Sequence, residues 1–487
     1  MGAASMIKAL WTIDDLLEGC PGGLEGTAPE NAACEGISID TRTIKKNNLF
    51  FALSGPHFDG HHFVATALQK GCSGAVVSRA AFAQQKNEWL SHKPGRFFIL
   101  VDDPLQALQS LAGWHRQRFT LPLIAITGSN GKTTVKEMTA GILKRRGPVL
   151  KTEGNFNNHI GLPLTLLRLT EEHHSAVIEM GINQKGEMAR LCDIARPTMG
   201  LITNIGPAHL EGLGNLEGVA QEKTVLFEKL QNTGTAIINM DDVFLKSWTD
   251  QVATQWTYGL ASNVGAYDLS ADHIVCESKT TAFTLHQNRS GESLSVTLPA
   301  PGHHHVSNAL AAASISAALD MPIKQIAEGL SDFQPLSQRT QILKTGGITL
   351  IFDAYNANPA SVEAALDLLA KQAQETGKRI AILGDMFELG DYSETAHHRI
   401  GQSVAAHGID GLIALGQYAE TLASGARAGG LPEKAVSVHQ DFKGLKTVLN
   451  KQIKAGDTLL IKGSRGMKLE RLLPFFGLDE TGMGDQN

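Results

Sequence analysis

The sequence predicts an α/β protein with three domains, and three observations lead to that prediction. The chain has 487 residues, more than one hydrophobic core usually supports. Apolar runs of strand length alternate with helical stretches along most of it, which is typical of mostly parallel sheets. One of these runs leads through a glycine-rich turn directly into a helix, as in P-loop proteins. We place the domains at residues 1–118, 119–332 and 333–487.

The first two domains differ in size but follow the same pattern. In the first, a small α/β unit, short apolar runs alternate with turn residues from residue 37 to 78, and a strand at Phe97–Val101 completes it. The second begins at Leu121. Its further buried strands are expected at residues 176–180, 201–205 and 236–240. Two-residue alternation at 266–298 predicts an antiparallel hairpin layer attached to this domain, and an alanine-rich helix follows at 306–319.

The third domain is predicted to be Rossmann-like. One of its helices is expected at residues 361–375, capped by Gly377. The prediction depends on the alternation of strands and helices alone, since the GxGxxG fingerprint is absent from the sequence. Its strands are expected near Leu350, Ile380, Leu412, Val436 and Leu459.

The glycine-rich turn, TGSNGKTT, is the most informative part of the chain. Gly128 and Gly131 leave room for backbone N–H groups to face a polyphosphate, and the helix start and Lys132 supply positive charge. Thr133 is suited to ligate Mg²⁺. Ile126 stands where the strict Walker pattern has its first glycine, so the turn is a shortened GxxGKT variant of that pattern. It indicates that the central domain is ATPase-like. It predicts binding of ATP or GTP. The residues expected around the phosphates are Gly128, Ser129, Asn130, Gly131, Lys132, Thr133 and Thr134.

The composition of the chain indicates which kinds of molecule it binds. With 43 basic and 49 acidic side chains, a net charge of −6 and no polybasic run, the chain is not expected to bind nucleic acid or an anionic membrane. Its five cysteines show no CxxC spacing and suit reduced thiols in the cytoplasm. No apolar run reaches the roughly 18 residues that a membrane span needs. We therefore expect a cytoplasmic monomer that acts on small-molecule substrates.

Three residues are candidates for metal binding, and for each the sequence leaves a structural alternative open. Taken alone, His209 is more typical of a surface or hydrogen-bonded core residue, and Lys223 of a solvated helix surface. Glu179 ends a buried strand, where its carboxylate can reach a metal held by nucleotide phosphates. His209 follows another strand, and Lys223 lies 14 residues further on, about 21 Å along one straight helix. Both can serve one metal cluster only if the chain turns between them, which the glycines at 212, 214 and 218 permit. The asparagine-rich run at 155–158 suits either a polar substrate or a simple turn.

Further motifs occur in order along nearly the whole chain. They are SIDTR from Ser38, FDGHHF from Phe58, GNFNNHIGLP, EMG at Glu179, NIGPAHLEGLG, GHHHVSNALAAA, DAYNANP from Asp353, LGDMFELG and KGSR from Lys462. Together with TGSNGKTT and Lys223, these motifs resemble those of the Mur ligase superfamily. Within it, YNANP with SIDTR and FDGH is similar to the branch that adds a dipeptide, and the DNPR element of the branch that adds diaminopimelate or lysine is absent.

The resemblance implies an ATP-dependent amide ligase of peptidoglycan precursor synthesis. Such an enzyme joins D-alanyl-D-alanine to the terminal carboxylate of UDP-N-acetylmuramoyl-tripeptide through an acyl phosphate. By the same resemblance, the first domain would hold the UDP-sugar and the second ATP. The third would swing in to complete the site, which would exclude water from the reactive intermediate.

The resemblance also implies roles for individual residues. Lys132, His209 and Lys223 would be the catalytic group, with Lys223 carbamylated. Magnesium, as two ions, would be held by Thr133, Glu179, His209 and Lys223. Asn308 would meet the adenine, and Arg339 and Asp353 would complete the nucleotide site. The expected substrate-binding residues are Ser38, Thr41, Arg42, Phe58, Asp59, Asn155, Asn157, Asn158, Tyr355, Asn356, Asn358, Lys462, Ser464 and Arg465.

A carbamate at Lys223 makes chemical sense. An ammonium group beside two Mg²⁺ ions is repelled, whereas a carbamate is a bidentate anionic ligand. With a reference pKa of about 10.4, only about one lysine in 2,500 is neutral at pH 7, so nearby cations must lower the pKa before CO₂ can react.

Two positions depart from the family pattern near the expected adenine site. His305 stands where relatives carry asparagine, and Gln338 precedes Arg339 where glycine is usual.

Two other functions stay open at this point. The first is another ATP-dependent amide ligase of the same superfamily, such as a folylpolyglutamate synthase, which would share the middle domain but not the UDP-sugar domain. The second is an ATP-driven switch that ligates nothing. Phosphate release that requires both substrates would separate an enzyme from a switch.

Overall fold

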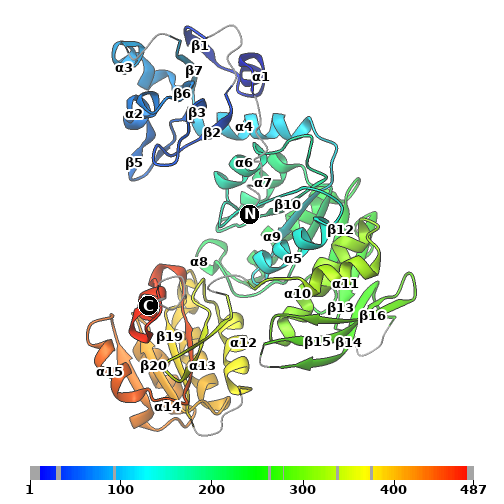
Figure 1. The fold of residues 1–487 in the computed structure, drawn as a ribbon, viewed down its shortest axis with the longest axis vertical. Coiled ribbons are helices and arrows are strands. Elements are labelled where there is room, and N and C mark those ends of the chain that lie inside the picture. Colours follow the sequence, from blue (N-terminus) through cyan, green and yellow to red (C-terminus); the bar gives the residue numbers. More distant parts are fainter. Residues whose placement is uncertain are drawn as a thin grey trace.

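The computed structural model describes residues 11–28, 34–91, 95–260, 265–277, 279–335, 339–372 and 377–479. These residues form three α/β units, each around its own main sheet, arranged along an arc (Figure 1). The N-terminal unit lies at one end, the unit that carries the glycine-rich turn lies in the middle, and the C-terminal unit lies at the other end. The predicted α/β class is therefore confirmed. None of the helices in the described ranges is long and apolar enough to cross a membrane.

The N-terminal unit contains a mostly parallel sheet in the order β1-β7-β6-β3-β2, in which only β1 is antiparallel to its neighbour. Its strands are β1 (Gly23–Gly26), β2 (Gly36–Ser38), β3 (Asn48–Phe51), β6 (Gly74–Ser78) and β7 (Phe97–Val101), and a separate ribbon pairs β4 (Ser54–Gly55) with β5 (Phe58–Asp59). The helices are α1 (Ile13–Gly19), η1 (Gly60–Phe63), α2 (Val64–Gln69), α3 (Arg79–Ser91) and α4 (Pro104–Gln117).

Helix α4 joins this unit to the middle one. It begins at a strong cap, because the Asp103 side chain accepts hydrogen bonds from Leu105 N and Gln106 N and proline occupies the first turn. Towards its other end, the buried Arg116 guanidinium donates to the Ala195 carbonyl at 3.0 Å, and His115 Nε2 donates to the Leu169 carbonyl at 3.0 Å. Side chains of α4 therefore satisfy backbone groups of the middle unit.

The middle sheet runs in the order β16-β15-β14-β13-β12-β11-β8-β10-β9, and its strands are parallel from β9 to β14. These are β8 (Leu123–Thr127), β9 (Val149–Lys151), β10 (Ser175–Glu179), β11 (Met199–Ile202), β12 (Thr235–Asn239), β13 (Thr254–Gly259) and β14 (Leu269–Cys276). The strands β15 (Thr281–Gln287) and β16 (Glu292–Leu298) continue the sheet in antiparallel fashion. The predicted alternation at 266–298 is thus antiparallel, but it extends the edge of the main sheet and does not form a separate layer.

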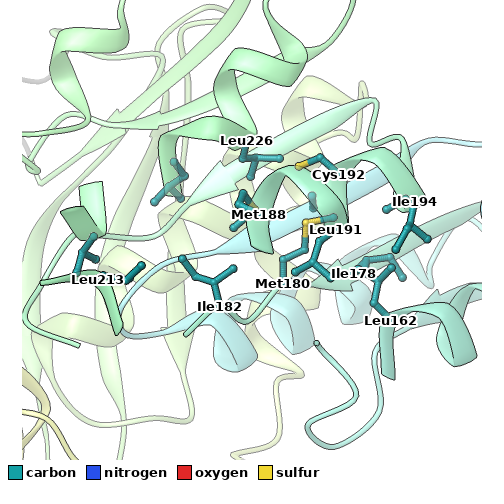
Figure 2. Close-up of a cluster of buried hydrophobic side chains, with 14 of the residues drawn as sticks. Leu162, Ile178, Met180, Ile182, Met188, Leu191, Cys192, Ile194, Leu213 and Leu226 are labelled. Carbon is teal, nitrogen blue, oxygen red and sulfur yellow. The ribbon is translucent and has the colours of Figure 1, made fainter. Parts of the chain in front are cut away.

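Helices cover both faces of this sheet. The helices of the middle unit are α5 (Lys132–Leu143), α6 (Gly161–Leu166), α7 (Glu187–Ala195), α8 (Leu210–Leu213), α9 (Leu216–Leu230), η2 (Lys246–Trp248), α10 (His303–Ala318) and α11 (Ile323–Ser331), of which α8 points towards the C-terminal unit (Figure 1). Figure 2 shows one side of the core, where Leu191 of α7 lies near Ile178 of β10 and Leu226 of α9 lies beside Met188 and Cys192 of α7. Burying side chains of this size contributes about 1.5–3 kcal/mol each. This packing fixes the strand ends that carry the polar residues described below.

The C-terminal unit has a sheet in the order β17-β18-β22-β19-β20-β21, parallel except for β17. Its strands are β17 (Gln341–Thr345), β18 (Ile348–Phe352), β19 (Arg379–Gly384), β20 (Gly411–Leu415), β21 (Val436–His439) and β22 (Thr458–Lys462). Its helices are α12 (Pro359–Ala370), η3 (Gly390–Tyr392), α13 (Ser393–Ala406), α14 (Ala419–Ala428), η4 (Glu433–Ala435), α15 (Leu445–Gln452), η5 (Arg465–Met467) and η6 (Leu469–Phe476). The predicted helix at 361–375 ends earlier, at Ala370 with Lys371 as its C-cap, so the predicted cap at Gly377 is wrong.

Candidate active site

The glycine-rich turn lies between β8 and α5 at the carboxyl end of the middle sheet. Gly128 and Gly131 both have left-handed backbones, with φ of 141° and 81°. A Cβ on Gly128 would lie 1.8 Å from Thr203 Oγ1, and one on Gly131 would lie 2.4 Å from Asn308 Oδ1. Only glycine fits at these two positions, which agrees with the expectation of a tight loop. Asn308 of α10 also lies against this loop.

Residues after β11 hold the loop in place. Asn204 accepts hydrogen bonds from Ser129 N at its carbonyl (2.9 Å) and from Asn130 N at its side chain (3.0 Å). Thr203 Oγ1 donates to the Asn130 carbonyl at 2.5 Å. Neither Thr203 nor Asn204 was predicted as a site residue. The signal that could have found them is a pair of polar side chains directly after a buried strand that neighbours β8.

Positive charge gathers at the loop from two parts of the chain. Lys132 Nζ donates to the Gly128 carbonyl at 2.7 Å, and burial lowers the pKa of this lysine while Glu179 opposes the shift. Arg339, from the start of the C-terminal unit, donates to Thr133 Oγ1 at 3.0 Å and stacks on the Tyr355 ring at 4.0 Å. The structure therefore brings together the predicted residues Lys132, Thr133, Arg339 and Tyr355.

Glu179 has one carboxylate oxygen held by a hydrogen bond and one that accepts none from the described part of the chain. The side chain is 3% exposed, and Oε1 accepts a hydrogen bond of 2.8 Å from Asn157 Nδ2. Oε2 has no hydrogen-bond partner within the described residues, and Lys136 Nζ lies 3.9 Å away. A buried carboxylate oxygen of this kind suits a hard cation such as Mg²⁺. Lys136, which sequence reasoning missed, lies on α5 one turn beyond Lys132.

His209 contacts a residue of the C-terminal unit. Its Nδ1 lies 2.5 Å from Oε2 of Glu388, and the His209 side chain lowers the pKa of this carboxyl by hydrogen bonding. His209 has a left-handed backbone with φ of 57°, directly before α8. Glu388 lies in the predicted LGDMFELG motif, but no role was predicted for it.

Lys223 is buried in α9, with 1% of its surface exposed. Burial lowers its pKa well below the ordinary value, and the charge of Lys132 lowers it further. The chain turns between His209 and Lys223 as predicted, because α8 ends at Leu213 and Asn215 caps a new helix, accepting a hydrogen bond from Gly218 N at 2.9 Å.

The predicted residues of the C-terminal unit form a connected group. Lys462 Nζ donates to Asp353 Oδ2 at 2.6 Å and to the Asn356 carbonyl at 3.0 Å. Asn358 caps α12 and also donates through Nδ2 to Asn130 Oδ1 of the glycine-rich loop at 2.8 Å. This hydrogen bond is a second direct contact between the C-terminal unit and the loop.

Two predicted residues that follow this group lie in different surroundings. Ser464 is 3% exposed, and its Oγ accepts from Phe387 N at 2.8 Å. The Arg465 side chain is 55% exposed and lies 3.3 Å from Glu470 Oε1. Arg465 is therefore the more accessible of the two to a substrate.

The asparagine-rich run has mainly local partners. Asn158 Oδ1 accepts from Ile160 N and Gly161 N, which starts α6, and Asn157 orients Glu179 as described above. The Asn155 carbonyl accepts from Asn157 N at 2.7 Å. Two of the three predicted side chains therefore hold protein groups.

Five predicted residues lie in the N-terminal unit, apart from the glycine-rich loop and the residues around it (Figure 1). They are Ser38, Thr41, Arg42, Phe58 and Asp59. Asp59 accepts hydrogen bonds from Ser54 Oγ at 2.8 Å and from His61 Nδ1 at 2.6 Å. Arg42 pairs with Asp40, its side chain 87% exposed. Phe58 is an exposed aromatic ring, the Ser38 hydroxyl donates to the Asp40 carbonyl, and the Thr41 carbonyl accepts from Lys70 Nζ.

His305 differs from the family pattern and is buried on α10. Burial lowers its pKa well below the ordinary value, and its Nδ1 has no hydrogen-bond partner within the described residues. It lines a small cavity together with Thr134 and Arg339. The other departure, Gln338, lies outside the described residues.

Models of one family match the chain in three stretches. Residues 34–116 match the Mur ligase family, catalytic domain; residues 126–316 match the Mur ligase middle domain; and residues 338–465 match the Mur ligase, glutamate ligase domain. The fold and the glycine-rich loop, with the charged residues around it, define an α/β protein of the P-loop nucleotide-binding class. The chain belongs to the Mur ligase family, so the resemblance seen in its motifs is confirmed.

Individual relatives match over nearly the full length. The UDP-N-acetylmuramoyl-tripeptide–D-alanyl-D-alanine ligase of Bacillus subtilis is 36% identical over 96% of this chain and 98% of its own, and that of Escherichia coli is 35% identical over 95% and 97%. The crystal structure of MurF from Acinetobacter baumannii superimposes with a TM-score of 0.84 at 30% identity, covering 96% of this chain and 99% of that one.

Proposed function

We propose that the chain joins D-alanyl-D-alanine to the terminal carboxylate of UDP-N-acetylmuramoyl-tripeptide at the expense of ATP, in peptidoglycan precursor synthesis. The Bacillus subtilis and Escherichia coli relatives carry the name of that activity and match over 95% or more of this chain. One observation in the structure carries the proposal. Arg339 and Asn358 reach the glycine-rich loop from the C-terminal unit, so two units meet where the nucleotide phosphates would lie.

The chemistry requires activation of an unreactive acid. A free carboxylate resists amines because its oxygen is a poor leaving group, so the γ-phosphoryl of ATP is transferred to the carboxylate oxygen and ADP leaves. The amine of D-alanyl-D-alanine then attacks the acyl carbon, and the tetrahedral intermediate collapses with release of phosphate. Lys132 offsets charge on the transferring phosphoryl, and contact between the units excludes water from the acyl phosphate.

The nucleotide is assigned to the loop and its neighbours. The loop of residues 128–134 faces the phosphates through backbone N–H groups other than those of Ser129 and Asn130, which are bound to Asn204. Asn308 faces the adenine, and Arg339 and Asp353 close the site from the C-terminal unit. These assignments are supported by the left-handed glycines at 128 and 131 and by the contact of Arg339 with Thr133.

Magnesium is assigned to Thr133, Glu179, His209 and a carbamylated Lys223, as two ions that neutralise phosphate charge when bound. The Oε2 atom of Glu179, which accepts no hydrogen bond from any described residue, supports this assignment. Carbamylation is supported by the lowered pKa of Lys223, because a neutral amine is the form that reacts with CO₂.

We assign the UDP-sugar to the N-terminal unit, at Ser38, Thr41, Arg42, Phe58 and Asp59. For the incoming dipeptide we favour Arg465 over Ser464, because the arginine is accessible and the serine hydroxyl is engaged with Phe387 N. The domain limits at residues 118 and 332 and a cytoplasmic monomer belong to the same proposal.

The test is a coupled assay of phosphate release by the purified full-length chain. We expect phosphate only when ATP, UDP-N-acetylmuramoyl-tripeptide and D-alanyl-D-alanine are all present, and separate reactions with lysine- and diaminopimelate-ended tripeptides identify the substrate. Activity with a folate and glutamate in their place would indicate a folylpolyglutamate synthase. ATP binding without phosphate release under all these conditions would indicate a switch and overturn the proposal.

A further inference from the structure

The closest polar contact described between the middle and C-terminal units joins His209 to Glu388. His209 follows β11 of the middle sheet, and Glu388 follows β19 of the C-terminal sheet. The imidazole Nδ1 lies 2.5 Å from the carboxylate Oε2. The backbones meet as well, because Glu211 N donates to the Glu388 carbonyl at 3.2 Å. The contact therefore consists of one side-chain and one backbone hydrogen bond.

Both residues are held in unusual backbone conformations. His209 and Glu388 have left-handed φ of 57° and 65°, which non-glycine residues rarely adopt. On the C-terminal side, neighbours of Glu388 are anchored: Met386 N donates to His397 Nε2 at 2.9 Å, and Phe387 N donates to Ser464 Oγ at 2.8 Å. The position of the Glu388 carboxylate is therefore set by the C-terminal unit, and it moves with that unit.

The contact decides which nitrogen of His209 carries the proton. An ionised carboxylate only accepts hydrogen bonds, so Nδ1 carries a hydrogen, and in the neutral imidazole the lone pair lies on Nε2. Metal-ligating histidines generally donate their other N–H to a carboxylate or carbonyl, which orients the ring and increases its basicity. Glu388 stands in that relation to His209, and it comes from a different unit of the molecule.

We propose that Glu388 is a positioning residue that presents Nε2 of His209 to magnesium, so that metal binding and docking of the C-terminal unit strengthen each other. This inference rests on the proposed function, in which His209 is a metal ligand. The coupling is reciprocal by linkage: if docking raises the affinity for the metal by some factor, the metal favours docking by the same factor. Loss of the carboxylate partner of a ligating histidine typically weakens metal binding about 10–100-fold.

The experiment uses the full-length chain with ADP and Mn²⁺ in place of Mg²⁺. Mn²⁺ affinity is measured by electron paramagnetic resonance of the free ion, and histidine coordination is measured by ¹⁴N modulation of the electron spin echo. Docking is followed by hydrogen exchange at the amide of Glu211, which donates across the interface. In the unmodified chain we expect ¹⁴N modulation, and we expect added Mn²⁺ to slow exchange at Glu211.

The variants separate positioning from a general structural effect. Glu388→Ala is expected to weaken Mn²⁺ binding about tenfold and to abolish the effect of Mn²⁺ on Glu211 exchange. Glu388→Gln keeps an accepting oxygen and is expected to recover part of both. Asp391→Asn removes an exposed carboxylate three residues further on, in η3, and is expected to behave like the unmodified chain.

Unchanged Mn²⁺ affinity and ¹⁴N modulation in Glu388→Ala would overturn the positioning role. Weaker binding with an unchanged effect of Mn²⁺ on Glu211 exchange would overturn the coupling to docking. Failure of the proposed function is recognised separately, because it appears as absence of phosphate release by the unmodified chain, whatever its response to Mn²⁺.

Discussion

Glu222 and Lys223 follow each other on α9, yet the carboxylate of Glu222 binds backbone groups at the start of α7. Its two oxygens accept hydrogen bonds from Gly186 N at 2.9 Å and Met188 N at 2.8 Å. Within the described residues, no ion pair is formed by Lys223 Nζ, which is buried close enough to Lys132 for that charge to lower its pKa. The sequence-adjacent acid therefore anchors a helix and leaves the lysine amine available for other chemistry.

We expect Glu222→Ala to destabilise the middle unit by about 1.5–3 kcal/mol, because each lost bond involves a charged acceptor and leaves a backbone N–H at a helix start. Urea unfolding followed by circular dichroism measures the change. Glu228→Ala, an exposed acid on the same helix, is the control and should stay within about 0.5 kcal/mol of the unmodified chain. Equal midpoints for both variants would show that Glu222 does not anchor α7.

Lys223→Gln is expected to abolish ligation while leaving the fold intact, since the amide removes the amine that would be carbamylated and fills a similar volume. In ¹³C-bicarbonate, the unmodified chain should show a carbamate carbon signal that Lys223→Gln lacks. Circular dichroism and the unfolding midpoint report on the fold. Near-normal turnover by the variant would remove the carbamate from the proposal.

Short-range patterns predicted the loop well. Residues 128–134 lie next to each other in the chain, so their arrangement depends on glycine sterics and on one strand–helix connection, both visible in the sequence. The end of β10 was predictable for the same reason, because Glu179 ends it, as expected from an apolar run followed by a charge. The strand predicted at 201–205 was placed wrongly, because β11 spans Met199–Ile202 and ends three residues earlier. Local signals of this kind are sufficient for the geometry of the loop to which we assign the nucleotide.

Contacts between distant segments were not predictable in this way. His209 and Glu388 are 179 residues apart, and their pairing depends on how two separately folded units dock. The hydrogen bond from the Asn157 amide to Glu179 was not predicted, because it depends on which strand end the loop packs against. Polar residues such as Asn204 look like ordinary loop residues until the neighbouring strand is known.

Gly128 of the loop and Gly141 of the following helix give a matched comparison. Gly128→Ala is expected to abolish ATP binding, because its Cβ would collide with Thr203 and its φ of 141° excludes other residues. Gly141 of α5 has no atom within 4 Å of an added Cβ, so Gly141→Ala should keep nucleotide binding and gain about 0.5–1 kcal/mol of stability. Isothermal titration with a non-hydrolysable ATP analogue checks both. Tight binding by Gly128→Ala would contradict the assigned role of the loop.

The buried His115 predicts loss of stability in acid. Burial lowers the pKa of this histidine to about 4, against an ordinary value of about 6.5. Its Nε2 donates to the Leu169 carbonyl, its Nδ1 has no partner within the described residues, and its ring lies 4.2 Å from that of Trp11. Protonation would thus place an unpaired charge between the N-terminal and middle units.

The direction of the effect follows from proton linkage. Below about pH 6.5 the unfolded chain binds a proton at His115 that the folded chain does not bind until about pH 4, so stability falls as the pH is lowered through this window. Because a shift of one pKa unit corresponds to 1.36 kcal/mol, the full loss of folding stability is about 3 kcal/mol. Other buried histidines contribute to the total, so the prediction concerns the difference from His115→Gln, in which this loss is absent. Urea unfolding of the two proteins is followed by tryptophan fluorescence at pH 7 and at pH 4.5. The difference between their midpoints should be smaller at pH 4.5 than at pH 7. A constant difference between them would mean that His115 takes up its proton equally in the folded and unfolded chains.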